Sequence, residues 1–281
     1  RSIIDRARSG GAAARPPVVV LGTGGSGTRA VAEVMKAAGV YLGPKQNKAS
    51  DSLEFKPFLV RWSTEYLTTS RWVEAIEADP NADIAGPPPE IVADLRAAIE
   101  RQRQGIPSPD ALWGWKNPRT TNLLPVLNAV APEARTAQLV RDGRDMAYSK
   151  NQNLLGDADV LTPEAMRDAP APVRLIALWS RMNLVNLAYM RRVKGDGHLV
   201  IRYEDLCADP ATHAERLLTH LGVPVTDQVL EMARETVKLA PSTGRWREAP
   251  ADELEAVLRA GTRRCASSAT SEMSEAYARR P

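Results

Sequence analysis

Short apolar runs alternate along the chain with longer segments of helical periodicity. Residues 18–21, 137–140 and 199–203 are such runs, and the first of them is Val-Val-Val-Leu. A β-branched run without polar alternation is typical of a strand buried on both faces of a parallel sheet. Residues 112–116 predict a fourth strand of the same kind.

Helices are predicted between these strands. Val31, Val34 and Met35 recur at helical spacing in residues 28–38, and Gly39 follows as a stop signal. The other segments with helical periodicity are residues 61–78, 89–104 and 175–193. This alternation predicts an α/β fold with a parallel β-sheet flanked by helices, in which ligands bind beyond the carboxyl ends of the strands.

The predicted organisation is one domain over residues 18–281, preceded by a flexible tail at residues 1–17. A helical insertion is predicted at about residues 61–110, and residues 156–172 are predicted to form a mobile flap over the acceptor pocket. Such insertions and lids commonly carry substrate specificity. Two interpretations are open for Trp62, Trp72 and Trp113. Their side chains would either face a ring of the acceptor or pack in the hydrophobic core.

Composition and charge narrow the classes of function that the chain could have. The 281 residues are 43% hydrophobic and 25% charged, with a net charge of +3, which is too small for a dedicated nucleic-acid binder but suits a local site for one anionic ligand. Cys207 and Cys265 form no Cys-x-x-Cys pair, so neither a disulfide framework nor a metal site is predicted. No apolar run has the length of a membrane span, and we expect a cytoplasmic protein.

A glycine-rich loop, Gly22-Thr23-Gly24-Gly25-Ser26-Gly27-Thr28-Arg29, follows the first predicted strand and precedes a helix. Backbone N–H groups at a helix N-terminus form an anion site. Gly22, Gly24 and Gly27 match the dinucleotide pattern GxGxxG, but no acidic residue closes a second strand about 20 residues on. A Walker loop would carry Lys after its last glycine, whereas Thr28 stands there. A phosphosulfate cradle is the third interpretation.

A second anion motif follows the predicted strand at residues 137–140. Arg141 lies at the strand end and Ser149 on the predicted helix that follows, and together they can converge on one phosphate through charge-assisted and hydroxyl hydrogen bonds. The alternative interpretation is a helix start capped by Asp142 and Asp145, with Arg141 paired to either carboxylate.

Taken in order, these motifs resemble the sulfotransferases that use 3'-phosphoadenosine-5'-phosphosulfate (PAPS). The resemblance runs from about residue 18 to residue 247. Its elements are the glycine loop, the Arg141…Ser149 spacing, Ile201-Arg202-Tyr203-Glu204-Asp205-Leu206, Trp115-Lys116-Asn117-Pro118-Arg119 and Gly244-Arg245-Trp246.

The resemblance implies a P-loop-like sulfotransferase fold and a role for each matched residue. The 5'-phosphosulfate of PAPS would be held by Gly24, Gly25, Ser26, Gly27, Thr28 and Arg29. Arg141 and Ser149 would bind the 3'-phosphate, Tyr203 would lie near the adenine, and Gly244 and Arg245 would close over the 3'-phosphate. Many family members carry Lys in the loop where this chain has Gly25, so another cation, Lys116 or Arg29, is expected to assist the leaving phosphate.

A carboxylate is expected to act as the general base. Sulfuryl transfer requires in-line positioning, cations on the departing oxygens and a base for the acceptor proton. The three histidines are poorly placed, because His198 precedes a strand and His213 and His220 lie on the helix after Tyr203. In the family, the segment after the glycine-loop helix often supplies an acid; Asp51 is the first candidate and Glu54 the second.

The expected reaction is transfer of a sulfuryl group from PAPS to a hydroxyl or amine of a small-molecule or carbohydrate acceptor, with adenosine 3',5'-bisphosphate (PAP) as product. Three alternatives remain open from the residues. They are a Rossmann NAD(P)-dependent oxidoreductase, a phosphoryl-transfer enzyme, and a non-catalytic protein that binds PAP or PAPS. The absence of Lys at Gly25 keeps the last of these open.

Overall fold

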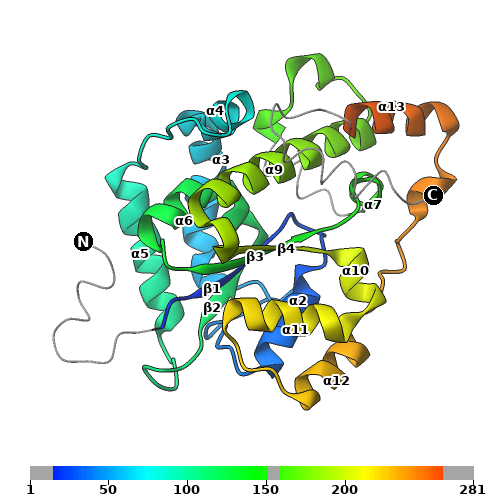
Figure 1. The fold of residues 1–281 in the computed structure, drawn as a ribbon. Coiled ribbons are helices and arrows are strands. Elements are labelled where there is room, and N and C mark those ends of the chain that lie inside the picture. Colours follow the sequence, from blue (N-terminus) through cyan, green and yellow to red (C-terminus); the bar gives the residue numbers. More distant parts are fainter. Residues whose placement is uncertain (1–14, 151–158, 262–281) are drawn as a thin grey trace.

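The structure is a computed structural model that describes residues 15–150 and 159–261 (Figure 1). The predicted tail lies largely outside the described residues, as do residues 156–158 of the predicted flap and Cys265. Contacts with the domain begin ahead of the first strand, because the Arg15 carbonyl accepts a hydrogen bond from Trp113 Nε1 at 2.8 Å. The Pro17 carbonyl also accepts one from Arg135 N at 3.0 Å.

The centre of the fold is a four-stranded sheet in the order β2-β1-β3-β4, in which every pair is parallel. Its strands are β1 (Val18–Leu21), β2 (Gly114–Lys116), β3 (Arg135–Val140) and β4 (His198–Arg202). All four strands predicted from the sequence are present, and the α/β prediction is confirmed. Their carboxyl ends meet at one edge of the sheet, so the segments that follow them are brought together.

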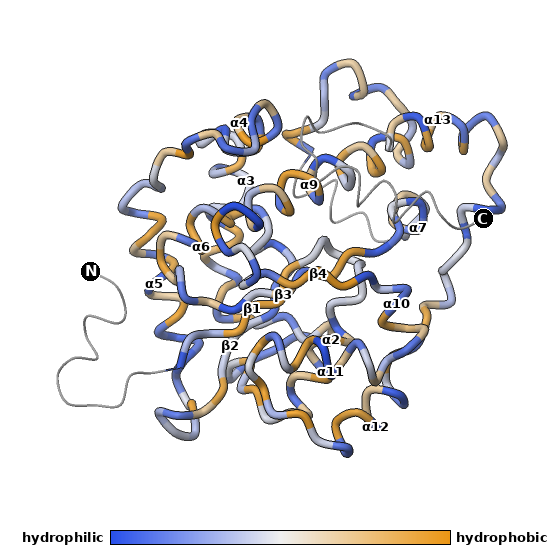
Figure 2. The backbone as a smooth tube through the Cα atoms, in the orientation of Figure 1, coloured by the Kyte–Doolittle hydropathy of each residue, from blue (hydrophilic) through white to orange (hydrophobic). Residues whose placement is uncertain are grey.

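Helices cover both faces of the sheet, and alternate residues of β1 serve the two cores. Val18 and Val20 pack on the side of α2 (Thr28–Ala37), α11 (Pro210–Leu221) and α12 (Asp227–Thr236). Val19 and Leu21 pack on the opposite side, with α6 (Leu124–Val130) and the long α9 (Ala171–Lys194). Figure 1 shows α9 on one face and α11 and α12 on the other, and Figure 2 shows the hydrophobic strands between these layers.

The segment between α2 and β2 contains η1 (Leu53–Phe55), α3 (Lys56–Ser70), α4 (Trp72–Ala78) and α5 (Pro89–Arg103). The single helix predicted over residues 61–78 is wrong in one respect. Arg71 has a left-handed backbone with φ of 52° and separates α3 from α4. Trp72, Trp113 and Trp62 are buried in the core, which favours the core interpretation of these rings.

The remaining short elements surround the strand ends. They are η2 (Pro118–Leu123), α7 (Gly143–Ala147), η3 (Asp159–Leu161), η4 (Glu164–Met166), η5 (Gly195–Gly197), α10 (Tyr203–Ala208), η6 (Arg245–Glu248) and α13 (Ala251–Gly261). The helix α13, which the sequence pattern did not indicate, packs on α9, and Ser180 Oγ donates to the Gly261 carbonyl at 3.1 Å. No helix in the described ranges has the length and apolar character needed to cross a membrane.

Candidate active site

The glycine loop connects β1 to α2 and has the geometry of an anion cradle. Gly25 and Gly27 adopt positive φ angles of 94° and 91°. Gly27 is the N-cap residue of α2 and provides no side-chain cap for its first N–H groups. Ser26 is fully buried, and its Oγ has no hydrogen-bond partner within the described part of the chain. A buried hydroxyl without a partner is costly in a folded protein, and an anionic ligand would satisfy it.

Tyr203 packs directly against the glycine loop. A Cβ atom at Gly27 would lie 2.4 Å from Tyr203 Cδ2, so only glycine leaves room for the ring. Burial raises the pKa of Tyr203 to about 12, which keeps the phenol protonated. Its hydroxyl donates to the Lys238 carbonyl at 2.9 Å and accepts from Ala240 N at 2.9 Å. Tyr203 begins α10 rather than ending a strand, and it joins the loop to the chain after α12.

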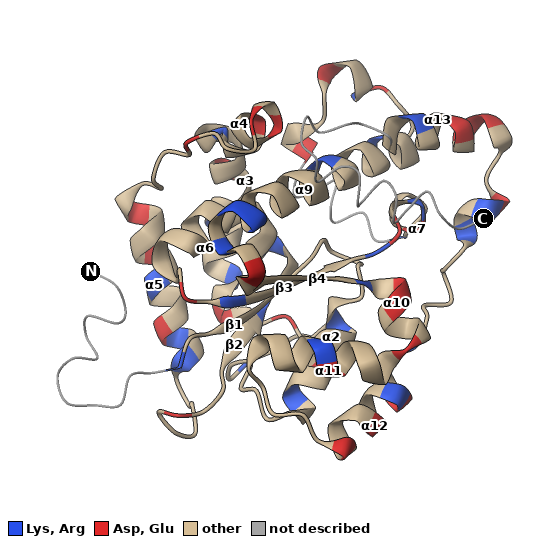
Figure 3. Ribbon diagram, viewed as in Figure 1, with Lys and Arg blue, Asp and Glu red and all other residues tan. Residues whose placement is uncertain are grey.

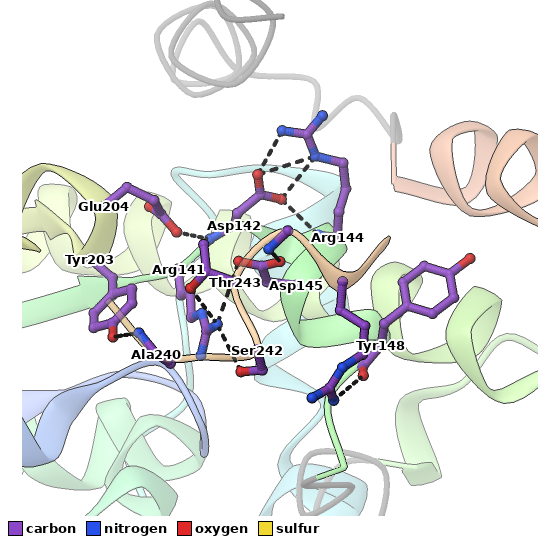
Figure 4. A network of polar contacts seen from close by, with 12 residues as sticks. Arg141, Asp142, Arg144, Asp145, Tyr148, Tyr203, Glu204, Ala240, Ser242 and Thr243 are labelled. Carbon is purple, nitrogen blue, oxygen red and sulfur yellow. Dashed lines mark hydrogen bonds and ion pairs between the residues drawn. The ribbon is translucent and has the colours of Figure 1, made fainter. Parts of the chain in front are cut away.

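Arg141 lies at the carboxyl end of β3, beside both the glycine loop and Tyr203 (Figure 4). Its guanidinium carbon is 5.0 Å from the centre of the Tyr203 ring, and Nη1 donates to the Gly25 carbonyl at 3.4 Å. Nη2 has three acceptors, all at 3.3–3.4 Å: Asp145, Ser242 and Thr243. Nε has no hydrogen-bond partner among the described residues, although Arg141 is only 6% exposed.

Arg141 is therefore a buried cation whose hydrogen bonds are long or missing. Charge-assisted hydrogen bonds between nitrogen and oxygen are normally about 2.7–2.9 Å long. A guanidinium presents five N–H donors in a planar fork that matches a phosphate. The geometry is that of a cation able to accept an anionic ligand.

The segment Lys238–Glu248 covers this cation, and we call it the strap. Asp145 Oδ1 accepts from the backbone N–H of Gly244 at 2.7 Å, and Asp145 Oδ2 lies 3.4 Å from Arg141 Nη2. Arg245 Nη1 is 3.5 Å from the Tyr148 carbonyl. Gly244 is thus bonded to the carboxylate that pairs with Arg141, and Arg245 contacts Tyr148, the C-cap residue of α7. Ser242, Thr243 and Asp145 belong to the same cluster, and sequence reasoning assigned no ligand role to them.

The structure places Ser149 differently from the predicted helix. Helix α7 ends at Ala147, and Ser149 follows it with its backbone N–H bonded to the Met146 carbonyl at 3.1 Å. The capping interpretation of this motif is also correct in part. Asp142 caps α7 by accepting from Arg144 N at 2.8 Å, and the Arg144 guanidinium stacks 4.0 Å from the centre of the Trp246 ring.

A second buried cation lies at the end of β2. The side chain of Lys116 is 2% exposed, and its Nζ donates to Asp51 Oδ1 and to the Ala49 carbonyl, each at 2.5 Å. Burial lowers the pKa of Lys116; the charge of the exposed Arg29 lowers it further, whereas Asp51 raises it. Two of the predicted residues, Asp51 and Lys116, are thus in direct contact.

The loop that carries Asp51 is braced by its own polar groups. Asn47 Nδ2 donates to Asp51 Oδ2 at 2.8 Å, and Asn47 Oδ1 accepts from the backbone N–H of Asp51 at 2.9 Å. Ser50 has a left-handed backbone with φ of 61°, and its hydroxyl donates to Glu33 of α2 at 2.5 Å. The role of Glu33 was not indicated by the sequence, because its partner lies 17 residues away in a loop.

The other candidates lie elsewhere. Glu54 is in η1. Burial raises the pKa of Tyr41, and the charge of Glu54 raises it further. Tyr41 pairs with Trp113, just before the start of β2. His198 begins β4, so it lies at the edge of the sheet opposite the glycine loop, as expected from the sequence. His213 and His220 are on α11. Within the described ranges, no group of three His, Cys, Asp or Glu side chains could hold a metal ion.

Basic and acidic side chains are interspersed over the described ribbon (Figure 3). The two cations of the candidate site, Arg141 and Lys116, differ from most of these charges because they are almost completely buried. Arg141 follows β3 and Lys116 is the last residue of β2, and these two strands lie on either side of β1 and its glycine loop. A loop of backbone N–H groups flanked by two buried cations can hold an extended ligand with more than one anionic group.

This combination of a parallel sheet, a glycine loop at its carboxyl edge and two flanking cations defines a phosphate-handling α/β protein. A model of the sulfotransferase family matches residues 16–227, and the chain therefore belongs to that family. No curated protein sequence matches the chain.

Two solved structures show the same fold. The mouse sulfotransferase SULT7A1 complexed with PAP has a TM-score of 0.53 and 14% sequence identity, covering 99% of this chain and 93% of that one. Sulfotransferase STF9 from Mycobacterium avium has a TM-score of 0.52 and 13% identity, covering 88% of this chain and 76% of that one. The predicted P-loop-like sulfotransferase fold is confirmed.

Proposed function

We propose that the protein transfers a sulfuryl group from PAPS to a hydroxyl or amine of a small-molecule or carbohydrate acceptor. The observation that carries this proposal is the environment of Arg141, which is only 6% exposed and lies beside the glycine loop. Its hydrogen bonds are long, and its Nε has no hydrogen-bond partner in the described chain. Such a group favours a ligand with a phosphate at this point, in addition to the anion held by the loop. PAPS carries a 3'-phosphate besides its 5'-phosphosulfate, and mouse SULT7A1 was solved with PAP.

The residues fit PAPS in two separate places. The 5'-phosphosulfate would be held by the backbone N–H groups of residues 24–29 and by Ser26 Oγ, which has no hydrogen-bond partner in the described chain. Arg141 would hold the 3'-phosphate, with Ser149, Gly244 and Arg245 near it, and the Tyr203 ring would lie beside the adenine. When bound, PAPS supplies the sulfuryl group and a phosphate leaving group.

Lys116 is our candidate for the cation that the loop lacks at Gly25. Its Nζ has three N–H donors, of which two are used by Asp51 and the Ala49 carbonyl. Arg29 is near enough to lower the pKa of Lys116 by its charge. We infer that the third donor of Lys116 stabilises the departing phosphate, with Arg29 adding charge from the solvent side. Preorganised donors of this kind stabilise developing charge without reorganisation.

Asp51 is our first candidate for the general base, ahead of Glu54. Asp51 is joined to Lys116 and held by Asn47, whereas the charge of Glu54 acts on Tyr41. Asp51 would accept the acceptor proton at a carboxylate oxygen while Lys116 stays protonated. A base must lie within hydrogen-bond reach of the proton it removes, and the position of Asp51 beside Lys116 supports this assignment.

The test is calorimetric titration with PAP beside 5'-AMP, ATP and NAD, for the wild-type protein and Arg141→Ala. We expect PAP to bind best, and Arg141→Ala to weaken PAP by roughly 10- to 100-fold, the value of a lost charge-assisted hydrogen bond. Stronger binding of NAD or ATP would overturn the proposal.

Turnover decides between an enzyme and a non-catalytic binding protein, the alternative kept open by Gly25. A panel of alcohols, phenols, sugars and amines is offered with PAPS, and release of PAP is followed. Tight PAP binding without PAP release on any acceptor class would favour the non-catalytic protein.

A further inference from the structure

The contacts of the strap support an inference that rests on the proposed PAPS site. We propose that Asp145 is a positioning residue that docks the strap over Arg141, and that this docking sets the preference of the protein for a 3'-phosphate. Asp145 lies on α7, one helical turn after Arg141, and its side chain is 2% exposed. A carboxylate buried to this extent requires strong partners.

The stronger of its two contacts belongs to the strap. Asp145 Oδ1 accepts from Gly244 N at 2.7 Å, whereas Asp145 Oδ2 and Arg141 Nη2 are 3.4 Å apart. A contact of 2.7 Å is at the short end of the range for N–H···O hydrogen bonds, and one of 3.4 Å lies outside it. Asp145 therefore makes its shortest hydrogen bond to the strap backbone and also lies within ion-pair distance of Arg141.

Side chains outside the strap bind its backbone at two points, with the phosphate-binding candidates between them. Tyr203 Oη holds the Lys238 carbonyl and the N–H of Ala240, and Asp145 holds the N–H of Gly244. Figure 4 shows Ser242 and Thr243 beside Arg141, and their hydroxyls lie 3.4 and 3.3 Å from Arg141 Nη2.

The backbone of the strap matches this attachment. Gly244 has a positive φ of 86°, its N–H bonds to Asp145, and the N–H of Thr243 bonds to the Ala240 carbonyl at 2.9 Å. Residues 240–244 thus form a turn whose far end depends on Asp145. An anion that reaches Arg141 also meets the two hydroxyls of this turn. Without Asp145 the backbone of the turn keeps its hydrogen bonds to Tyr203 but loses the one at Gly244, and the side-chain contacts of Arg245 and Trp246 remain. We expect the two hydroxyls to be less firmly positioned in that case.

The test compares Asp145→Ala, Asp145→Asn and a control, Asp196→Ala, which removes an exposed carboxylate of η5 next to the start of β4. The first measurement is hydrogen exchange of the strap amides without ligand. The second is the ratio of dissociation constants for 5'-AMP and PAP, which isolates the contribution of the 3'-phosphate.

Asp145→Ala is expected to speed exchange of the Gly244 amide by about tenfold or more and to lower the 5'-AMP/PAP ratio by about tenfold, as for loss of a charged hydrogen bond. Binding of 5'-AMP itself should change less than about twofold. Asp145→Asn keeps a carbonyl oxygen for the Gly244 N–H and should restore the ratio to within about threefold of wild type. Asp196→Ala should match wild type in both measurements.

A purely structural role for Asp145 would lower the melting temperature and leave the ratio unchanged, and that outcome would overturn the inference. Unchanged exchange of the strap in Asp145→Ala would overturn it as well. If Asp145→Ala does not fold, the double variant Ser242→Ala/Thr243→Val removes the two hydroxyls alone, and it should lower the ratio by about fivefold or more. An unchanged ratio in that variant would also contradict the inference.

Failure of the proposed function gives a different result. In that case wild-type protein itself shows no preference for PAP over 5'-AMP, while the exchange of the Gly244 amide still decides whether Asp145 docks the strap.

Discussion

The two buried cations of the site are held in opposite ways. Arg141 has contacts of 3.3–3.4 Å and an Nε without a partner in the described chain, whereas Lys116 has two contacts of 2.5 Å. Burial of a charge is costly unless it is paired. Lys116 is already paired with Asp51, so its charge is fixed in place before any ligand arrives. Arg141 lacks comparable partners, which is the state expected of a group completed by its ligand.

The largest expected effect comes from removing the charge of Lys116, the cation that is paired with Asp51. Lys116→Met should lower kcat by about 10²- to 10³-fold, or about 2.7–4 kcal/mol of transition-state stabilisation, because it removes a preorganised donor. The measurement is release of PAP from PAPS with the acceptor that gives the fastest turnover. Lys48→Met, which changes an exposed lysine near Asp51, is the matched control and should retain the wild-type rate.

A rate for Lys116→Met within tenfold of wild type would contradict the assignment and leave Arg29 as the remaining candidate. Asp51→Asn sharpens the result, because it keeps Lys116 but removes the carboxylate. If Lys116 and Asp51 act as a unit, the double variant should lose no more activity than the worse single variant.

The contact between Gly27 and Tyr203 tests the donor side. Gly27→Ala and Gly39→Ala both place a side chain at a positive φ, of 91° and 82°, but a Cβ at Gly39 meets nothing within 4 Å. Gly39→Ala should cost about 1 kcal/mol of unfolding free energy from the backbone alone. Gly27→Ala should cost about 2 kcal/mol more, because the new methyl group overlaps the Tyr203 ring. Denaturant titration measures both values, and equal costs would show that the ring yields without penalty.

The sequence predicted the strands and the two cations for the same reason. Apolar runs identify buried strands without knowledge of their neighbours. Arg141 follows one of these strands, and Lys116 is the last residue of another. In a parallel sheet the position after a strand is itself a prediction of proximity. The pairing of Asp51 with Lys116 was not derivable, because 65 residues separate them and a loop carboxylate has no periodic signal.

The strap was the least predictable part of the site. Its main contact joins Asp145 to the backbone N–H of Gly244, 99 residues away. Because every non-proline residue has a backbone N–H, the sequence carries no signal for such a contact. Sequence reasoning therefore gave Asp145 only a capping role, whereas the cap of α7 is Asp142. The break at Arg71 was missed for a related reason, because an arginine in a left-handed conformation carries no turn signal.

His198, a half-buried base, shows how its surroundings change a pKa when no carboxylate offsets them. His198 lies at the opposite edge of the sheet, where its Nδ1 is 2.9 Å from Thr136 Oγ1. Burial lowers the pKa of His198 to about 3, and the charges of His220, Arg191 and Lys194 add to this effect. Lys116 differs because Asp51 partly offsets the same burial. His198 should therefore be neutral in the folded protein at neutral pH.

The stability of the protein should then fall as the pH drops below about 6.5, the usual value for the unfolded chain, because only the unfolded state takes up the proton. This contribution is present in full above that pH and is lost at about 1.4 kcal/mol per pH unit. Between pH 7 and pH 5, His198→Gln should lose about 2 kcal/mol less unfolding free energy than wild type. Denaturant unfolding at the two pH values is the measurement, and parallel losses in both proteins would contradict the prediction.

The smallest expected effect concerns the loop that positions Asp51. Ser50 and Arg71 are the two non-glycine residues with positive φ in the described chain, at 61° and 52°. Arg71→Gly should stabilise the protein by about 1 kcal/mol, because it relieves a left-handed backbone. Ser50→Gly gains the same relief but loses the hydrogen bond to Glu33, which is worth about 1.5–3 kcal/mol for a charged acceptor. The net change for Ser50→Gly should therefore be a destabilisation of about 1 kcal/mol. If the two variants stabilise equally in denaturant titrations, Glu33 does not brace the loop, and the position of Asp51 beside Lys116 depends on Asn47 rather than on Glu33.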